Sequence, residues 1–344
     1  MPEQRSYRLR VAEIVEETAD ARSLVFEVDG AHRADFAYRP GQFLTVRIPS
    51  DRCGSVARCY SLSSSPHVDD RLQVTVKRTA DGYGSNWLCD EIAAGDELEA
   101  LPPAGVFTPK SLDADLVLFA AGSGITPVMS IVKSALAKGS GRVVLVYANR
   151  DDRSVIFAGE LGALASRHPS RLVVVHWLES VQGLPTARPL AALAAPYAGY
   201  EAFVCGPKPF MAAVREALTA LDVPRSRVRL ERFQSLGANP FERVTPSPVT
   251  ESRGSSTVEV TLDGATHRFD WPATTKLLDL LLDNDVDAPY SCREGACSAC
   301  ACRLVAGEVK MLNNDVLEDE DIEEGIILAC QSVPVTDAVE ISYE

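Results

Sequence analysis

The sequence predicts a multidomain chain in which an antiparallel β-barrel is followed by an α/β parallel-sheet domain and a smaller α+β domain. Short alternating segments separated by turn residues fill residues 1–110. Apolar strands alternate with helical segments over residues 111–235. A stretch rich in Ser, Pro and Thr at residues 236–254 indicates a linker to a cysteine-bearing segment, residues 255–344. A chain of 344 residues is long enough for three such domains.

The first domain is predicted from its turn-bounded strands. Segments 22–28, 43–48 and 72–77 carry alternating apolar residues, and the turn pair Pro40-Gly41 precedes the second segment. Strands this short, joined by turns, are typical of a small antiparallel barrel.

The second domain is predicted from continuous apolar strands. We expect strands at 116–121, 142–148, 171–178 and 201–205, and helices at 127–138 and 210–221. Apolar strands that alternate with helices indicate a parallel sheet covered on both faces.

The last domain is predicted to begin with a hairpin and a helix. Segments 257–262 and 267–271 flank the turn pair Asp263-Gly264, and the helix is expected at 276–284. The cysteine-rich loop follows this helix.

Acidic charge is concentrated in the last domain. The chain has a net charge of −14, and residues 255–344 carry 19 acidic and 5 basic side chains, so the first 254 residues are neutral overall. Such a surface repels phosphates, and we therefore predict no nucleic-acid binding. The acidic face either attracts a partner with a basic docking face or serves only solubility.

Two further features of the chain concern its location. No apolar run approaches the ~18 residues of a membrane span, so no membrane association is predicted. The N-terminal residues 1–11 lack the apolar block of a secretory signal, and clustered cysteines suit metal better than disulfides. We expect a cytoplasmic protein.

Four of the nine cysteines have the spacing of a plant-type 2Fe-2S site, which places two thiolates on each iron. They are Cys292, Cys297, Cys300 and, thirty residues later, Cys330. Small residues between the first three leave room for backbone amides to point at the cluster sulfides. Four cysteines also satisfy zinc, but zinc ribbons usually pair two short-spaced cysteine units. Cys302 falls outside this pattern and is expected to pack in the core.

Residues 255–344 resemble plant-type ferredoxins along their whole length, including Leu328-Ala-Cys330-Gln. The resemblance implies a β-grasp fold in which Cys292, Cys297, Cys300 and Cys330 bind the cluster.

A second group of motifs lies in the predicted barrel: Arg58-Cys-Tyr60-Ser61, then Val76-Lys77-Arg, then Gly82-Tyr-Gly-Ser85-Asn-Trp-Leu. Together they resemble the flavin signature of the ferredoxin-NAD(P)+ reductase superfamily. In this signature Tyr60 can face the isoalloxazine ring, the Ser61 hydroxyl lies near N5, and Arg58 can bind the pyrophosphate. Ser85 lies at a helix start, where backbone amides bind phosphate. We predict FAD, with FMN as the alternative. The predicted flavin-binding residues are Arg58, Tyr60, Ser61, Val76, Lys77, Gly82, Ser85 and Phe107.

A third motif, Gly122-Ser-Gly124-Ile-Thr126-Pro127, lies where a predicted strand meets a helix. It departs from the Gly-x-Gly-x-x-Gly fingerprint because Pro127 takes the place of the third glycine. Proline fits the first turn of a helix, whose amides then face a pyrophosphate. The same superfamily carries this form, which implies a nicotinamide-binding loop.

Two later segments support nicotinamide binding through the same resemblance. It places the cysteine of Cys205-Gly206-Pro207 beside the nicotinamide C4 atom, and Asn149 in a ribose-contacting segment. An inert buried thiol is the alternative for Cys205. The neighbouring charges are mixed, since Asp151 and Asp152 repel a 2′-phosphate whereas Arg150 and Arg153 attract one. We predict NADH.

The segment Glu231-Arg-Phe233 closes the reductase part, at a position where the superfamily carries an acidic or aromatic residue near the flavin. Phe233 is therefore predicted to contact cofactor, with interdomain packing as the alternative. We predict Ser61, Cys205 and Glu231 as the catalytic residues.

Over its full length the chain resembles the reductase components of Rieske oxygenases, in particular those that act on steroids. Residues 54–62, 76–83, 148–157 and 176–180 carry this resemblance. It implies FAD, NADH, one 2Fe-2S cluster and a terminal oxygenase, of the Rieske type, that docks on the acidic domain. The chain itself has no Cys-x-His pattern for a Rieske cluster, so substrate oxidation is expected elsewhere.

Other functions remain open on sequence alone. The same architecture serves phenylacetyl-CoA epoxidases and di-iron hydroxylases. A stand-alone NADH-dependent flavoreductase and a zinc-stabilised interaction module are the remaining alternatives.

Overall fold

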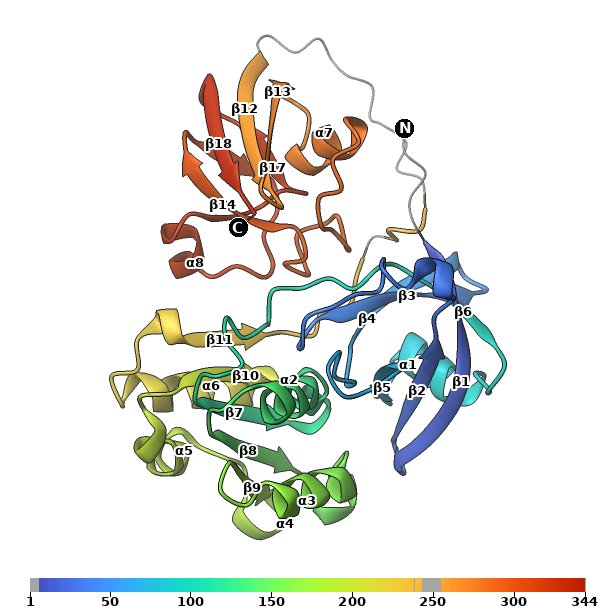
Figure 1. Cartoon of the computed structure of the whole chain (residues 1–344), viewed down its shortest axis with the longest axis vertical. Coiled ribbons are helices and arrows are strands. Elements are labelled where there is room, and N and C mark those ends of the chain that lie inside the picture. Colours follow the sequence, from blue (N-terminus) through green and yellow to red (C-terminus); the bar gives the residue numbers. More distant parts are fainter. Residues whose placement is uncertain (1–5, 238, 243–254, 344) are drawn as a thin grey trace.

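The computed structural model describes residues 6–237, 239–242 and 255–343, and three large sheets follow one another along the chain, with a two-stranded sheet, residues 309–311 and 332–334, beside the third (Figure 1). The predicted linker, residues 236–254, lies mainly outside the described residues, so its conformation stays untested. No helix in the described ranges has both the length and the apolarity to cross a bilayer.

The first sheet is antiparallel and has the strand order β4-β3-β6-β1-β2-β5. A bridge between Leu62 and Val74 joins the end of β4 to β5, which curls the sheet into a barrel. The following helix, α1, packs on the barrel through Leu88 and Cys89. The elements are β1 (Tyr7–Thr18), β2 (Ala21–Glu27), β3 (Phe43–Ser50), β4 (Gly54–Ser61), β5 (Leu72–Lys77), α1 (Tyr83–Asp90) and β6 (Glu97–Ala100).

The second sheet is parallel, in the order β11-β10-β7-β8-β9. Its strands are β7 (Leu116–Ala121), β8 (Val143–Asn149), β9 (Leu172–Leu178), β10 (Glu201–Cys205) and β11 (Val228–Glu231). The helices are α2 (Ile125–Lys138), α3 (Ala158–Arg167), α4 (Glu179–Gln182), α5 (Ala187–Ala194) and α6 (Lys208–Thr219). Short 3-10 turns are η1 (Gly30–His32), η2 (Gly122–Gly124), η3 (Asp152–Ser154), η4 (Ala195–Tyr197) and η5 (Arg225–Arg227).

Strand β7 shows why this sheet is apolar throughout. Leu116 and Leu118 pack in the core that contains α2 and α3, whereas Val117 and Phe119 pack in the core that contains α5 and α6. Successive side chains of a strand point to opposite faces, so both faces of the sheet are buried. The predicted parallel sheet with helices on both faces is confirmed.

The third sheet is mixed, in the order β13-β12-β18-β14-β16, with β12 and β18 parallel. Leu277, Leu278 and Leu281 of α7 pack in one core with Val258 and Ile341 of the sheet, as expected of a β-grasp fold. The elements are β12 (Ser255–Leu262), β13 (Ala265–Pro272), α7 (Leu277–Asp283), β14 (Ala301–Ala306), β15 (Val309–Met311), α8 (Asp319–Glu323), β16 (Ile326–Leu328), β17 (Ser332–Pro334) and β18 (Ala338–Ser342).

Candidate functional site

The carboxyl edge of the parallel sheet brings together residues that are far apart in the sequence. Cys205, the last residue of β10, pairs with Ala120 of β7 on one side and with Glu231 of β11 on the other. Asn149 ends the neighbouring strand β8. Loops at this edge of an open parallel sheet form its ligand-binding crevice. The predicted nicotinamide residues therefore meet at one place.

Glycines allow two loops at this edge to touch. A side chain on Gly124 would place its Cβ 2.2 Å from the Cys205 carbonyl oxygen, and one on Gly206 would place it 2.9 Å from the Ala121 Cβ. The Thr126 hydroxyl donates to the Ser123 carbonyl at 3.1 Å and closes the turn into α2. The start of this 14-residue helix thus presents backbone amides where a pyrophosphate fits.

Asn149 supplies a polar group that lacks a partner. It is buried, and its side-chain amide lies beside the Tyr147 hydroxyl but makes no hydrogen bond of normal geometry within the described part of the chain. Burying an amide without a partner is costly. An orphaned amide at the crevice fits a polar ligand such as the nicotinamide nucleotide.

Cys205 and Glu231 are both buried at the crevice. Burial raises the pKa of Glu231 to about 8, so the carboxyl is largely protonated at neutral pH and can donate a hydrogen bond. Burial, followed by the neighbouring Glu231, raises the pKa of the Cys205 thiol. Cys205 is therefore a neutral thiol, suited to packing against a planar ring and not to nucleophilic attack.

The predicted flavin residues Arg58, Tyr60 and Ser61 lie on β4, and the bridge from Leu62 to Val74 connects the end of β4 to β5, which reaches the nicotinamide loop. Lys77 of β5 makes this connection, because a Cβ on Gly122 would lie 3.7 Å from the Lys77 ammonium nitrogen. The positive charge and the aromatic side chain thus lie on adjoining elements, which fits a flavin with an anionic pyrophosphate.

Three other predicted flavin residues, Ser85, Val76 and Phe107, make contacts within the protein itself. The Ser85 hydroxyl accepts from the Thr79 amide at 3.1 Å and donates to the Gly82 carbonyl at 3.2 Å, which orders the turn before α1. Val76 is fully buried in the barrel core. Phe107 is buried in an edge-to-face contact with Phe203, at a centroid distance of 5.2 Å.

Phe233 lies just beyond β11, and its ring is 49% exposed. Phe233 is therefore not packed in a protein core. Its contact with the cofactor stays a prediction. Val76 and Phe107 face a protein core, so any effect of these two residues on a cofactor operates through packing.

The four predicted cluster ligands are buried, unpaired cysteines in one region of the third domain. The Cys292 amide donates to Cys297 Sγ at 3.3 Å, and the Cys330 amide donates to Cys300 Sγ at 3.4 Å. Hydrogen bonds from Cys297 and Cys330 lower the pKa of Cys292, and the same contacts help to raise the pKa values of the two donors. The four sulfurs are thus close enough together to serve as ligands of one cluster.

Further amides point at the same sulfurs. The amides of Glu294 and Ala296 lie 3.5 Å and 3.3 Å from Cys292 Sγ. Across residues 6–237, 239–242 and 255–343, no three His, Cys, Asp or Glu side chains are grouped to hold one metal ion. Four thiolates with amide donors fit a two-iron cluster that binds two cysteines at each iron. Cys302 is buried beside Ile327, in agreement with its predicted packing role.

The cluster loop contacts the flavin strands directly, which sequence motifs did not reveal. The hydroxyls of Thr45 in β3 and Ser291 lie 2.5 Å apart, and Ser291 lies 3.8 Å from Cys59 Sγ. Ser291 precedes the ligand Cys292, and Cys59 lies between Arg58 and Tyr60. Phe43 and Ala57 pack in the same small core as Cys292 and Cys297.

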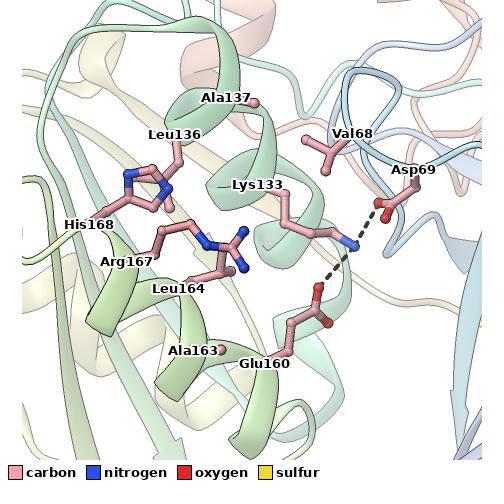
Figure 2. Close-up of a pocket in the computed structure, with 10 residues that line it drawn as sticks. All are labelled: Val68, Asp69, Lys133, Leu136, Ala137, Glu160, Ala163, Leu164, Arg167 and His168. Carbon is pink, nitrogen blue, oxygen red and sulfur yellow. Dashed lines mark ion pairs between the residues drawn. The ribbon is translucent and has the colours of Figure 1, made fainter.

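A second contact missed by sequence reasoning joins the barrel to the parallel-sheet domain. The Lys133 ammonium, on α2, lies 2.8 Å from an Asp69 carboxylate oxygen and 3.4 Å from a Glu160 carboxylate oxygen. Figure 2 shows it between these acids, at a cavity of about 300 Å³ that Arg167 and His168 also line. The Ser65 and Ser134 hydroxyls lie 2.8 Å apart at the same boundary between the two domains, which we call the seam. The sequence signal for this contact is Lys133 itself, a charged residue in the apolar middle of α2.

Three domain families match the chain in the order of its three sheets. Residues 8–108 match the oxidoreductase FAD-binding domain, and residues 118–216 match the oxidoreductase NAD-binding domain. Residues 260–335 match the 2Fe-2S iron-sulfur cluster binding domain. FAD, NAD and a 2Fe-2S cluster are therefore the cofactors of these domains.

Similar proteins cover the whole chain. The "3-ketosteroid-9-alpha-monooxygenase, ferredoxin reductase component" of Rhodococcus rhodochrous is 62% identical over 98% of this chain and 97% of that protein. The protein of the same name from Mycolicibacterium smegmatis is 61% identical over 98% and 96%. The solved structure of phthalate dioxygenase reductase aligns over 98% of both chains with a TM-score of 0.58 and 25% identity. The predicted resemblance and three-part fold are confirmed.

Proposed function

The chain belongs to the family of ferredoxin reductase components of monooxygenases, and we propose that it carries electrons from NADH through FAD and a 2Fe-2S cluster to a Rieske-type terminal oxygenase. The family membership makes it an oxidoreductase. The finer points, which are the oxygenase type, the docking face and the roles of single residues, form the proposal.

The contact between Ser291 and the flavin strands carries this proposal. Ser291 adjoins the ligand Cys292, and its hydroxyl lies 2.5 Å from that of Thr45. Cys59, 3.8 Å from Ser291, is flanked by the two residues predicted to hold the flavin, Arg58 and Tyr60. Successive side chains of a strand point to opposite faces, so Arg58 and Tyr60 lie on the other face of β4 from Cys59. The predicted flavin residues and the cluster loop are therefore on the two faces of one strand.

When bound, NADH supplies a hydride, FAD takes up two electrons and releases them singly, and the cluster accepts one electron at a time. Arg58 and Lys77 would hold the flavin pyrophosphate, and Tyr60 and Ser61 would orient the ring. The loop from Gly122 to Pro127, with Asn149 and Pro207, would hold the dinucleotide. Cys205 and protonated Glu231 would orient the nicotinamide ring and exclude water beside it. Cys292, Cys297, Cys300 and Cys330 would bind the two irons.

The preference for NADH is supported by the position of Arg150. Its guanidinium nitrogen lies 2.8 Å from an Asp20 carboxylate oxygen, an acid that also lies 3.8 Å from the Lys77 ammonium. Asp151 and Asp152 follow Arg150 directly, and Arg153 comes next. A 2′-phosphate would meet two carboxylates, Arg153 and an arginine that already pairs with Asp20, a balance that favours NADH.

We infer further that the oxygenase docks on the acidic domain and belongs to a 3-ketosteroid 9α-hydroxylase. The relatives at 61% and 62% identity bear that monooxygenase's name. The excess of acids in residues 255–344 favours a basic docking face on the partner. All nine cysteines are unpaired, which supports a reducing cytoplasm. We propose domain boundaries at residues 1–110, 111–235 and 255–344.

Reconstitution tests the proposed function. Purified chain, NADH, a 3-ketosteroid and the oxygenase component of a 3-ketosteroid 9α-hydroxylase are combined, and 9α-hydroxylated product is measured against NADH consumed. We expect coupled product formation. NADH oxidation without steroid product, when the oxygenase is active with another reductase, would contradict the assigned partner.

Replacing one ligand tests the electron path. We expect Cys297→Ser to lose the visible absorbance of the cluster and the reduction of cytochrome c. Ferricyanide reduction by NADH should stay within about twofold of wild type, because ferricyanide takes its electrons from the flavin and does not need the cluster. Cys302→Ser, at a buried non-ligand cysteine, is the control and should keep the cluster. Equal loss of both activities in Cys297→Ser would contradict separate flavin and cluster sites.

A further inference from the structure

One carboxylate of the cluster domain is surrounded by arginines of the NAD-binding domain. The Glu318 side chain is only 11% exposed. Its Oε1 accepts from Arg215 Nη1 at 2.7 Å and from Arg232, and its Oε2 accepts from Arg225 Nη2 at 3.3 Å. We call Arg215, Arg225 and Arg232 the arginine cluster.

The arginine cluster is built from three separate elements. Arg215 lies on α6, Arg225 begins η5, and Arg232 follows β11. Glu318 precedes α8, which lies at the edge of the cluster domain that faces β11 (Figure 1). Glu318 also caps α8 by accepting from the Asp321 amide, so its direction is set by the helix. Ion pairs here therefore orient one domain against the other.

The other contacts of the cluster domain are hydrogen bonds and apolar packing. They include the Thr45–Ser291 hydroxyl pair and the small core around Ala296. The Gly237 amide also donates to a Glu294 carboxylate oxygen at 2.8 Å, and Gln234 Nε2 donates to the Asp315 carbonyl at 2.7 Å. Each of these hydrogen bonds has one donor, whereas Glu318 accepts from three guanidinium groups, whose hydrogen bonds are charged and directional. The contact at Glu318 is thus the one suited to setting orientation.

We propose that Glu318 is a positioning residue: its ion pairs with the arginine cluster hold the cluster domain where the loop that carries Cys292 faces the flavin strands, and so set the rate of internal electron transfer. This inference rests on the electron path proposed above. An isolated surface ion pair contributes little to stability, but a nearly buried carboxylate shared by three guanidinium groups forms a network. Without its charge, three guanidinium groups of the NAD-binding domain would repel one another, with Asp321, 3.6 Å from Arg225, as a remaining carboxylate.

Glu318→Gln tests this role, because glutamine keeps the capping oxygen and removes the charge. The readout is stopped-flow bleaching of the cluster after NADH is mixed with the FAD- and cluster-loaded protein. We expect the rate to fall about tenfold, which corresponds to ~1.4 kcal/mol of docking free energy. Ferricyanide reduction, which needs only the flavin, should not change. High salt should slow bleaching in wild type but not in the variant.

Glu320→Gln is the matched control, since Glu320 is exposed on α8 and its loss changes the net charge equally. We expect it to behave as wild type. Arg215→Gln should slow bleaching as well, and the double variant with Glu318→Gln should be less impaired than the sum of the two effects. Small-angle scattering of the loaded proteins should show a larger radius of gyration for Glu318→Gln than for wild type. Glu320→Gln should have the radius of gyration of wild type.

The outcomes separate this proposal from the proposed function. If wild type bleaches with NADH but Glu318→Gln bleaches equally fast, Glu318 has no positioning role. Equal slowing in Glu320→Gln would also overturn the role, because charge loss alone would then explain the effect. If wild type itself does not bleach while its flavin is reduced, the electron path fails instead.

Discussion

At the residue scale, the chemistry of the crevice depends on burial. Cys205 and Glu231 are adjacent across parallel strands at the carboxyl edge of the sheet, and both are shielded from water. Shielding keeps each group neutral near pH 7, so neither group adds a charge beside the nicotinamide loop. The residue types were predictable from the sequence, but their protonation depends on the packing of neighbouring strands.

Glu231 gives a pH prediction. Its pKa rises from 4.5 to about 8 on folding, so the folded state holds the proton more tightly than the unfolded state. The proton held by Glu231 therefore adds to the free energy of unfolding, and this contribution is complete below pH 4.5. It is lost as the pH rises through about 8, and the total loss is on the order of 4 kcal/mol. Glu231→Gln stays neutral, so we expect a smaller fall of thermal stability across this range. If the melting temperatures of wild type and Glu231→Gln changed equally with pH, a raised pKa of Glu231 would be contradicted.

At the element scale, the start of α2 has the same construction as many phosphate-binding helices. Strand β7 ends at Ala121, η2 turns the chain, and α2 begins at Ile125 against the β10 loop. The helix starts at Ile125, two residues before the predicted start at Pro127. Proline fits any position in the first helical turn, because the amides of that turn have no helical hydrogen-bond partner. Local spacing was therefore sufficient to place the loop, but not its contact with Cys205.

Gly124→Ala tests this close approach. A methyl group would lie 2.2 Å from the Cys205 carbonyl oxygen, so the loop has to shift away from β10. We expect kcat/KM for NADH, with ferricyanide as acceptor, to fall about 10- to 100-fold. Gly162→Ala in α3, where nothing lies within 4 Å, is the control and should raise stability by ~0.5–1 kcal/mol with unchanged kinetics. Unchanged kinetics in Gly124→Ala would contradict the close packing of the two loops.

At the scale of the whole molecule, three domains with their own cores meet through a few polar contacts and small apolar clusters. The barrel meets the parallel-sheet domain at Lys133, and the cluster domain meets the other two at Ser291 and Glu318. Ser291 adjoins the predicted ligand Cys292, and Arg232, a partner of Glu318, adjoins Glu231. Contacts between domains thus orient predicted cofactor sites relative to one another, while the cores stabilise each domain.

Lys133→Met tests the seam in Figure 2. Methionine keeps the apolar stem but leaves Asp69 and Glu160 without the ammonium group. Because both acids are partly exposed, we expect a stability loss of only ~1–2 kcal/mol. We also expect a severalfold fall in kcat for NADH-dependent ferricyanide reduction, since α2 begins at the nicotinamide loop. Lys138→Met, at the exposed end of the same helix, should match wild type; an equal loss there would contradict a specific seam.

The sequence by itself determined the order of the domains, the class of the first two sheets and the cofactors, and it supplied the candidate residues for each cofactor site. These features depend on short spacings, such as three cysteines within one loop or two glycines at a strand end, which local backbone geometry translates directly into a site. Only the tertiary structure decided that Ser291 meets Thr45, that Lys133 joins two domains and that Glu318 meets three arginines. Those partners lie far apart in the chain and on separate domains, and their pairing depends on how folded surfaces pack, which no local pattern encodes.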